Sequence, residues 1–428
     1  YLVFNRTDLS EDTFYTQIKK IPHSSLFHLS EKGFNINRWY FLKERISYHP
    51  TNSSNFLELL KDAVKLRLRS DVPVGVCLSG GLDSSSIVSI LIKLFSKFDL
   101  NTFSAVYGKG EPGDESPYIN LYKYALPNMF FTTPTADSLY NDADSFIYAM
   151  GEPVPSTSPY AQYKVMELAK DYVVVTLDGQ GADEQLAGYD YFFGYLFKEL
   201  IYNFKLYRLF IELYYYLKNH KSLFGFQSSL YFMLPGFVQA KLRNNALGYV
   251  NKDLQVTYLR TNRVTENLYK ANTLQNALLN HFEYKLEHLL KWEDRNSMNF
   301  SLEARVPFLD YRLVEYNLSS YSNMIIHNGT TKYILREAMR NILPEEIRTR
   351  KDKVGFETPQ DKWFRTSKWQ SRIKDIIYSS KLSPYIYSEI AAKLYQDHLQ
   401  GKRNIAKEIW KWINLDRWLE SATFEKTK

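Results

Sequence analysis

The sequence predicts an α/β fold, in which a parallel sheet is flanked by helices and followed by a helical C-terminal extension. Short apolar runs at Val74–Leu78, Asn101–Tyr107 and Tyr172–Leu177 alternate with stretches of helical periodicity. A glycine-rich or polar loop follows each run, and strands that alternate with helices are typical of a parallel sheet. At 428 residues the chain exceeds one ordinary core, so two or more units are expected.

Composition narrows the class of partner. Lys and Arg number 54 against 47 Asp and Glu, a net charge of +7 that suits anionic small molecules. The sequence has no dense basic run, so no nucleic acid is expected. It also has no uncharged apolar run of about 18 residues, so no membrane partner is expected. The single cysteine, Cys77, excludes a disulfide within the chain and agrees with a cytoplasmic location.

The first part of the chain is predicted to carry no chemistry. Residues 1–45 alternate turns with short β pieces, including the cluster around Leu26 and the run Asn35–Tyr40. Residues 46–54 form a polar linker. Asn55 is a plausible N-cap for the helix that ends near Leu68 and leads into the first buried strand.

The loop after that strand predicts a phosphate site. Two glycines permit a tight turn and a close backbone approach, and the helix that follows offers free N–H groups to an anion. No lysine follows the glycines, so the loop is not of the Walker A type. The loop supplies hydroxyl donors and one carboxylate that suits Mg²⁺; its candidate residues are Ser79, Gly80, Gly81, Asp83, Ser84 and Ser85.

A second candidate stretch is Asp178-Gly-Gln-Gly-Ala-Asp-Glu184. Its glycines allow a ligand to approach the backbone, and Asp183 and Glu184 offer hard oxygen ligands. A solvated turn is the structural alternative. Because this stretch follows a buried strand, and Asp83 lies on a sister loop, binding of a metal and phosphate is the better interpretation.

Several later segments have both a structural and a functional interpretation. The aromatic residues of 189–234 are interpreted mainly as core, with a partner surface as the alternative. Glu303 and Arg305 form either an internal ion pair or a substrate contact. The cationic stretch 348–356 is either a solvated face or a group of charges that neutralises pyrophosphate. Three tryptophans near the end are expected to pack on a closing helix: Trp410, Trp412 and Trp418.

Taken together, these motifs resemble one family. The loop S-G-G-x-D-S resembles that of ATP pyrophosphatases with a PP-loop, HUP-like fold. VCLSGGLDSSS, LDGQGADEQLAGY, SLEARVPFLDYR, TKYILREA and RTRKDKVGF occur in the order seen in glutamine-dependent asparagine synthetases. The resemblance covers about 46–428. Residues 1–45 resemble the tail of the preceding glutaminase domain. The amino-terminal Cys nucleophile of that domain is absent, so the chain as it stands is not expected to hydrolyse glutamine.

The resemblance implies that ATP adenylates a carboxylate, aspartate above all, with release of pyrophosphate, and that ammonia then attacks to give the amide. Mg²⁺ is the implied cofactor, and a homodimer is expected. Glu152 would be the acid/base residue. Lys353 would stabilise the transition state, with Lys351 as the nearest competitor. The remaining roles are implied in groups: pyrophosphate at Ser79, Gly80, Gly81, Asp83, Ser84 and Ser85; Mg²⁺ at Asp83 and Asp183; adenosine at Cys77, Ala105, Asp178 and Gly179.

Other activities remain open. The loop at 178 reads Asp-Gly-Gln where many members of the family have Ser-Gly-Glu. Relatives of this type include β-lactam synthetases, lasso-peptide cyclases and polysaccharide amidotransferases, which differ in the acyl acceptor. An inactive ATP-binding partner protein is a further alternative. A tRNA thiolase or ligase is disfavoured by the single Cys and by the lack of a basic surface.

Overall fold

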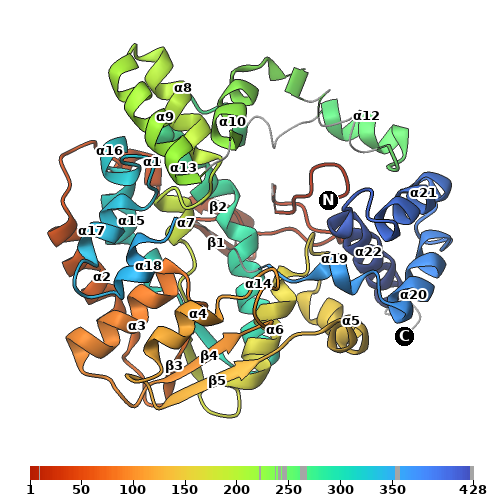
Figure 1. Cartoon of the computed structure of the whole chain (residues 1–428). Coiled ribbons are helices and arrows are strands. Elements are labelled where there is room, and N and C mark those ends of the chain that lie inside the picture. The colour runs from red at the N-terminus through yellow and green to blue at the C-terminus, as the bar shows by residue number, and fades with distance from the viewer. Residues whose placement is uncertain are drawn as a thin grey trace.

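A computed structural model describes residues 1–8, 10–220, 223–236, 238–239, 242, 248–260, 268–351 and 357–424. Its centre is a parallel five-stranded sheet in the order β5-β4-β3-β6-β7 (Figure 1). The chain runs from β3 through β4 to β5 on one side, then returns to β6 and β7 on the other. The strands are β3 (Val74–Cys77), β4 (Asn101–Ala105), β5 (Asn128–Thr132), β6 (Val175–Leu177) and β7 (Glu303–Arg305).

The fold class predicted from sequence is confirmed, with differences at strand ends. β4 ends at Ala105, two residues before the predicted Tyr107. β6 begins at Val175, because the N–H groups of Tyr172 and Val173 donate to the carbonyl of Ala169 in the turn that ends the preceding helix. The sequence analysis did not predict β7, whose short Glu-Ala-Arg segment is polar and acquires strand geometry by pairing with β6.

Helices cover both faces of the sheet. α3 packs on β3, α6 packs on β4 and β5, and α14 packs on β7. The helices around the sheet are α2 (Ser53–Arg67), α3 (Leu82–Phe95), α4 (Ser116–Ile119), α5 (Ala136–Met150), α6 (Ser158–Ala169), α7 (Ala182–Gln185), α13 (Leu274–Tyr284), α14 (Leu286–Asn299), α15 (Tyr311–Leu318), α16 (Ser322–Ile325), α17 (Tyr333–Ala338) and α18 (Glu345–Thr349). Two 3-10 turns, η1 (Asn120–Tyr122) and η3 (Pro307–Leu309), complete this layer.

The N-cap of α2 differs from the prediction. The side chain of Asn52 accepts the N–H of Asn55 at 2.8 Å, so Asn52 is the cap and Asn55 lies in the first turn. Both residues are asparagines followed by the same helical pattern, and the extended backbone of Asn52 decides between them.

Two further groups of helices lie beyond the sheet (Figure 1). The first group is α8 (Phe192–Tyr202), α9 (Leu206–His220) and α10 (Phe224–Met233). The C-terminal group is α19 (Gln360–Trp363), α20 (Ser367–Ile377), α21 (Ser388–Leu399) and α22 (Ala406–Phe424), with α12 (Lys252–Arg260) nearby. Trp410, Trp412 and Trp418 are buried in α22, as the sequence predicted.

The hydrophobic interior has two main parts. One joins the sheet to α2, α3, α8, α13 and α17, and it contains the buried aromatics of the 189–234 region. The other joins α5 and the C-terminal helices, and it includes Leu2 and Val3 from the start of the chain. The predicted core role is confirmed for Phe192, Phe193, Tyr195 and Tyr216.

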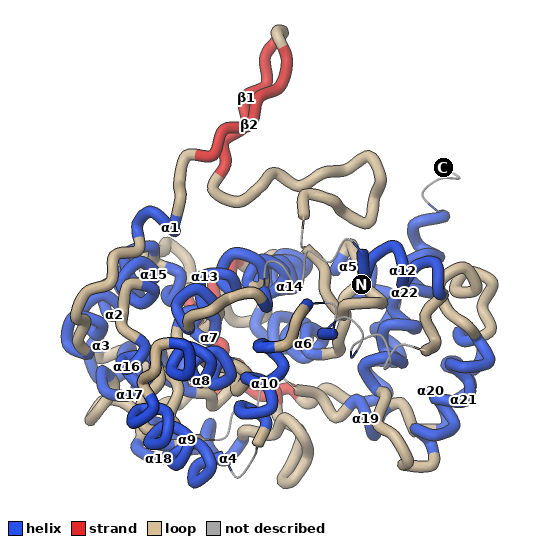
Figure 2. Tube along the Cα trace, turned by 90° about the horizontal axis from the view of Figure 1, so that it is seen from above, coloured by secondary structure: helices blue, strands red, loops and turns tan. Residues whose placement is uncertain are grey.

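Residues 25–38 form a hairpin that extends away from the rest of the molecule (Figure 2). Its strands, β1 (Ser25–Ser30) and β2 (Gly33–Arg38), pair antiparallel, and the short helix α1 (Leu42–Arg45) follows. Leu26 and Leu29 are exposed on the hairpin. That residues 1–45 belong to a separate domain stays a prediction.

Candidate active site

A cavity of about 890 Å³ opens at the carboxyl ends of the parallel strands. Its wall includes Cys77 at the end of β3, Ala105 at the end of β4, and Asp178 and Gly179 just after β6. The strand order reverses at β3, and open α/β sheets bind ligands in the crevice at such a reversal. The position and the volume both suit a small-molecule ligand.

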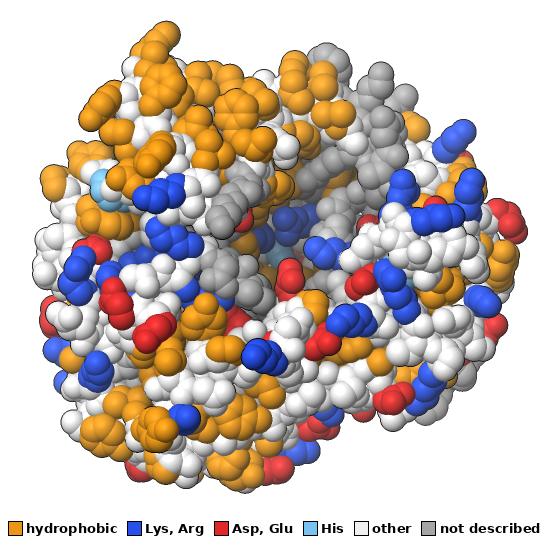
Figure 3. Space-filling model, in the orientation of Figure 1, with side chains coloured by type: hydrophobic (Ala, Val, Ile, Leu, Met, Phe, Trp, Pro, Cys, Tyr) orange, Lys and Arg blue, Asp and Glu red, His pale blue; other side chains and the backbone are white. Residues whose placement is uncertain are grey.

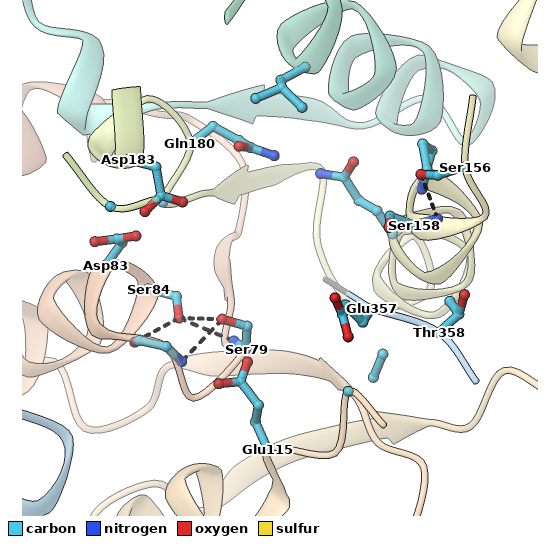
Figure 4. A pocket seen from close by; sticks show the side chains of 18 of the residues that line it. Ser79, Asp83, Ser84, Glu115, Ser156, Ser158, Gln180, Asp183, Glu357 and Thr358 are labelled. Atoms are coloured by element: carbon cyan, nitrogen blue, oxygen red, sulfur yellow. Dashed lines mark hydrogen bonds between the residues drawn. The ribbon is translucent and has the colours of Figure 1, made fainter. Parts of the chain in front are cut away.

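The predicted phosphate loop forms one edge of this cavity. The Ser79 N–H donates to Ser84 Oγ at 3.2 Å, and the two hydroxyl oxygens lie 3.0 Å apart (Figure 4). The Gly81 N–H donates to Ser79 Oγ at 3.2 Å. These bonds fix the hydroxyls beside the N-terminus of α3, whose N–H groups and dipole favour an anion. Ser85 is fully buried and lies outside the cavity wall.

Gly80 shapes the loop through its backbone. Its φ is +82°, and a Cβ there would lie 3.0 Å from the carbonyl oxygen of Glu115. Arg350, which is buried and lines the cavity, bridges this contact, since its Nη1 donates to the carbonyl of Gly80 at 3.2 Å and to Glu115 Oε1 at 2.6 Å. The guanidinium also stacks on Tyr118, 3.9 Å from the ring centroid. The sequence analysis did not name Glu115, and it included Arg350 only within the cationic stretch 348–356.

The carboxylates of Asp83 and Asp183 both contact the ammonium group of Lys332. Lys332 Nζ lies 2.7 and 2.5 Å from the two carboxylate oxygens of Asp83 and 2.6 Å from Asp183 Oδ1. Burial lowers the pKa of Lys332, but the charges of Asp183 and Asp83 outweigh it and raise that pKa above its ordinary value. Gly188 leaves room for the pair, because a Cβ there would lie 1.7 Å from Asp183 Oδ1. The two predicted metal ligands therefore face a common point (Figure 4).

This arrangement fits a magnesium ion. The donors are hard carboxylate oxygens, and both reach a single positive centre already occupied by an ammonium group. Within the described part of the chain, no group of three or more His, Cys, Asp or Glu side chains comes together as a metal site. Two carboxylates are the usual protein share of a Mg²⁺ site that also takes phosphate oxygens and water.

Two buried acids, Asp178 and Glu293, lie close together at the start of the loop 178–184. Burial raises the pKa of Asp178 to about 6, against hydrogen bonds from Cys77 and Thr176 that lower it. Burial also raises the pKa of Glu293, and the negative charge of Asp178 raises it further. Neither Glu293 oxygen has a hydrogen-bond partner among the described residues. The cavity wall at Asp178 therefore takes up a proton at moderately acidic pH.

Glu152 lies outside the cavity wall. Its Oε1 accepts the N–H of Phe14 at 2.9 Å, and its Oε2 accepts from Lys291 Nζ at 2.6 Å. Lys291 also contacts Asp8 at 2.8 Å, so Glu152 belongs to an ion network that ties the N-terminal segment to α14. A role for Glu152 as an acid or base stays a prediction.

Lys353 lies outside the described residues. Its competitor, Lys351, lines the cavity and donates to Asn219 Oδ1 at 2.8 Å. Glu303 and Arg305 do form an ion pair, at 2.8 Å, away from the cavity, although the Glu303 side chain is exposed. Glu184 does not face the Asp83–Asp183 pair; it is buried and accepts from the Tyr189 hydroxyl.

The wall opposite the phosphate loop was not predicted. Ser156 and Ser158 at the start of α6 face Glu357 and Thr358 across that side, and Gln180 lies near Asp183 (Figure 4). Only Gln180 belonged to a named motif. The others carry no local signal, since they come from segments about 200 residues apart that pack against one another.

Comparison with known proteins adds to this geometry. The family model described as asparagine synthase matches residues 55–420. The chain belongs to the asparagine synthase family. It is 27% identical over 452 residues to asparagine synthetase [glutamine-hydrolyzing] 1 of Bacillus subtilis, covering 97% of this chain and 67% of that protein. It is 28% identical to asparagine synthetase 3 of the same organism over 378 residues, covering 83% and 57%. The human asparagine synthetase is 23% identical over 431 residues, covering 94% and 61%.

Family membership supports a ligase that uses ATP to form an amide, and the recognition made from sequence is confirmed. The substrate and products need separate argument, because the chain spans roughly three fifths of the length of these relatives. Among the described residues, no helix is long and apolar enough to cross a membrane.

Proposed function

We propose that this chain converts aspartate to asparagine, with ATP giving AMP and pyrophosphate and with ammonia as the nitrogen that is transferred. The observation that carries the proposal is that Asp83 and Asp183 both contact the ammonium group of Lys332 beside the phosphate loop. That geometry suits a triphosphate and a divalent ion, and the family adds amide formation. The name of the B. subtilis relative points to glutamine as the source of the ammonia.

The first step is adenylation. A carboxylate oxygen of the substrate attacks the α-phosphorus of ATP, the bond to the β-phosphate oxygen breaks, and pyrophosphate leaves. Backbone N–H groups at the start of α3 and the hydroxyls of Ser79 and Ser84 would hold the leaving group. Asp83 and Asp183 would hold Mg²⁺, which supplies charge neutralisation when bound. Lys332 adds a positive charge at the same place.

The second step forms the amide. Ammonia attacks the acyl carbon, the bond to AMP breaks, and the nitrogen gives up a proton. Adenosine would rest against the backbone of Cys77, Ala105 and Gly179, all on the cavity wall. Glu152 remains the proposed proton acceptor on the strength of the family resemblance. Lys353 remains the proposed stabiliser of the transition state, with Lys351, which lines the cavity, as the alternative.

The test is pyrophosphate release from Mg²⁺-ATP with aspartate and ammonium, with the amino-acid product identified by mass spectrometry. We expect release and asparagine in equal amounts, and we expect Asp83→Ala to reduce both by at least about a thousandfold. If release occurs only with another carboxylate, the aspartate assignment fails and amide formation stands. If no carboxylate among amino acids, peptides and uronic acids supports release, the activity itself is refuted.

The native nitrogen donor, a homodimer and a cytoplasmic location stay predictions. Comparing glutamine with ammonium in the same assay tests the expectation that this chain does not hydrolyse glutamine. Light scattering during size-exclusion chromatography measures the oligomeric state.

A further inference from the structure

α9 and α10 carry apolar side chains that face outward. On α9, Tyr207, Phe210, Tyr214 and Leu217 are 82%, 68%, 61% and 40% exposed. They recur at spacings of three and four residues, which places them on one side of the helix. On α10, Phe224 and Leu230 are also exposed. We call these six residues the aromatic face; hydrophobic side chains gather over these helices in Figure 3.

The aromatic face is distinct from the inner side of α9. Tyr216 is buried against Phe193, and its hydroxyl accepts the N–H of Gly225 at 2.9 Å, which ties α9 to α10. Because the inner side anchors the helix, the outer rings are not needed to hold it in place. An exposed apolar surface of this kind marks an interaction site.

The charge around this face is positive. Between Tyr202 and Val250 the sequence has six Lys and Arg residues and one acid, Glu212. Glu212 is buried and turned inward, where its carboxylate accepts the N–H groups of Asn328 and Gly329. Lys205 and Lys218 lie at the two ends of α9 and are exposed. The outer side of α9 therefore offers rings and cations, with no carboxylate from the same helix to balance them.

We propose that the aromatic face binds the surface of an anionic phospholipid bilayer. Tyr and Phe rings beside lysines suit the boundary between acyl chains and negative headgroups, where an amphipathic helix can lie without crossing. A second copy of this chain is less suitable, since a two-fold contact would bring Lys205 and Lys218 of both copies together with no acid on α9 to pair them. This proposal departs from the sequence expectation of no membrane partner, which considered only segments long enough to cross a bilayer; binding at the surface does not require such a segment.

Vesicle flotation tests the proposal on the full chain. We expect binding to vesicles that contain phosphatidylglycerol, little binding to pure phosphatidylcholine, and a loss of binding as salt rises. Replacing Tyr207 and Phe210 with Gln should reduce the bound fraction at least about fivefold, because two inserted rings are removed while helix propensity is kept. Lys205→Glu with Lys218→Glu should reduce it on anionic vesicles as well.

The control removes two exposed rings elsewhere, by Tyr124→Gln with Tyr378→Gln, and should leave binding unchanged. The aromatic face does not line the cavity, so the variants that replace only rings should keep the pyrophosphate-release rate of the parent, which separates this proposal from the proposed function. Absence of binding to anionic vesicles overturns the proposal, as does an equal loss in the control. A dimer that Tyr207→Gln with Phe210→Gln dissociates, without vesicle binding, would assign the face to a second copy instead.

Discussion

Lys332 and Asp178 are buried at the same cavity. Burial favours the neutral form of both side chains, but their different neighbours lead to opposite outcomes. Lys332 stays charged because two carboxylates surround its ammonium group. Burial raises the pKa of Asp178 and favours its neutral form, and the hydrogen bonds with Cys77 and Thr176 offset this only in part. At this scale, a metal ion would change the charge around Lys332, Asp83 and Asp183, and a proton would change the charge of Asp178.

Removing the ammonium group of Lys332 tests whether it offsets the repulsion between Asp83 and Asp183. Lys332→Met leaves Asp83 and Asp183 facing each other without a cation, so we expect a loss of about 3 kcal/mol in the free energy of unfolding without metal. Mg²⁺ should restore more stability to this variant than it adds to the wild type. Urea denaturation with and without Mg²⁺ measures both effects. Lys351→Met, which removes a lysine that contacts Asn219, is the control and should show neither.

Measuring stability over a pH series tests the raised pKa of Asp178. The folded pKa of Asp178, about 6, lies above the ordinary value of 3.8, so the folded protein binds the proton more tightly than the unfolded chain does. The stability contributed by this group therefore falls as pH rises from about 4 to 6 and stays low above that. Asp178→Asn should raise the free energy of unfolding by about 1–3 kcal/mol at pH 8 and by clearly less at pH 5. A gain that does not depend on pH would show that the charge is not the cause.

At the scale of elements, the phosphate loop is held between α3 and the segment that carries Glu115. The turn is tight because Gly80 adopts a positive φ and its backbone lies against the Glu115 carbonyl, while the buried Arg350 binds both residues. A helix N-terminus, a glycine turn and a distant arginine thus act as one unit. The motif alone reveals the first two and not the third.

Gly80→Ala tests this close approach. We expect a loss of about 1–3 kcal/mol of stability and a KM for ATP raised by at least about tenfold, since the strained turn must shift away from Glu115. Gly108→Ala is the matched control, because Gly108 also has a positive φ, +98°, and a Cβ there meets nothing within 4 Å. Equal effects of the two substitutions on KM would contradict the account.

At the scale of the whole molecule, the ends of the chain meet around α5. The first residues pack with α22, and the Tyr1 hydroxyl contacts the carbonyls of Val154 and Lys411. The hairpin β1–β2, by contrast, projects away from the sheet and from the C-terminal helices (Figure 2). Residues 1–3 therefore contribute to the folded core, and the hairpin does not.

Two variants test whether residues 1–3 stabilise the fold and the hairpin does not. Leu2→Ser with Val3→Ser should lower Tm by several degrees, since each places a hydroxyl in a buried apolar site. Replacing residues 25–38 by a short glycine–serine linker should leave Tm within about 2 °C of the parent. Thermal unfolding followed by circular dichroism measures both. The reverse order of effects would refute the division.

Much of this architecture was predictable from local sequence. The apolar runs of β3, β4 and β6 and the loops that follow them specify the sheet, the phosphate loop and both carboxylates. β7 was missed because Glu303–Arg305 carries no β pattern of its own and pairs only through β6. Lys332 and Arg350 lie in quoted motifs, TKYILREA and RTRKDKVGF, but neither received a site role of its own, and Glu115 was missed entirely. Their contacts join segments 235 to 270 residues apart, and a local motif does not show which distant residue its side chains will contact.

The most direct test of the central claim is calorimetric titration of Mn²⁺ with a non-hydrolysable ATP analogue into the wild type, Asp83→Asn, Asp183→Asn and the double variant. If the two carboxylates share one ion, each single variant should weaken Mn²⁺ binding by about a hundredfold, and the double variant should be scarcely weaker than either. Losses that add in the double variant, or wild-type affinity in Asp183→Asn, would contradict a shared ion.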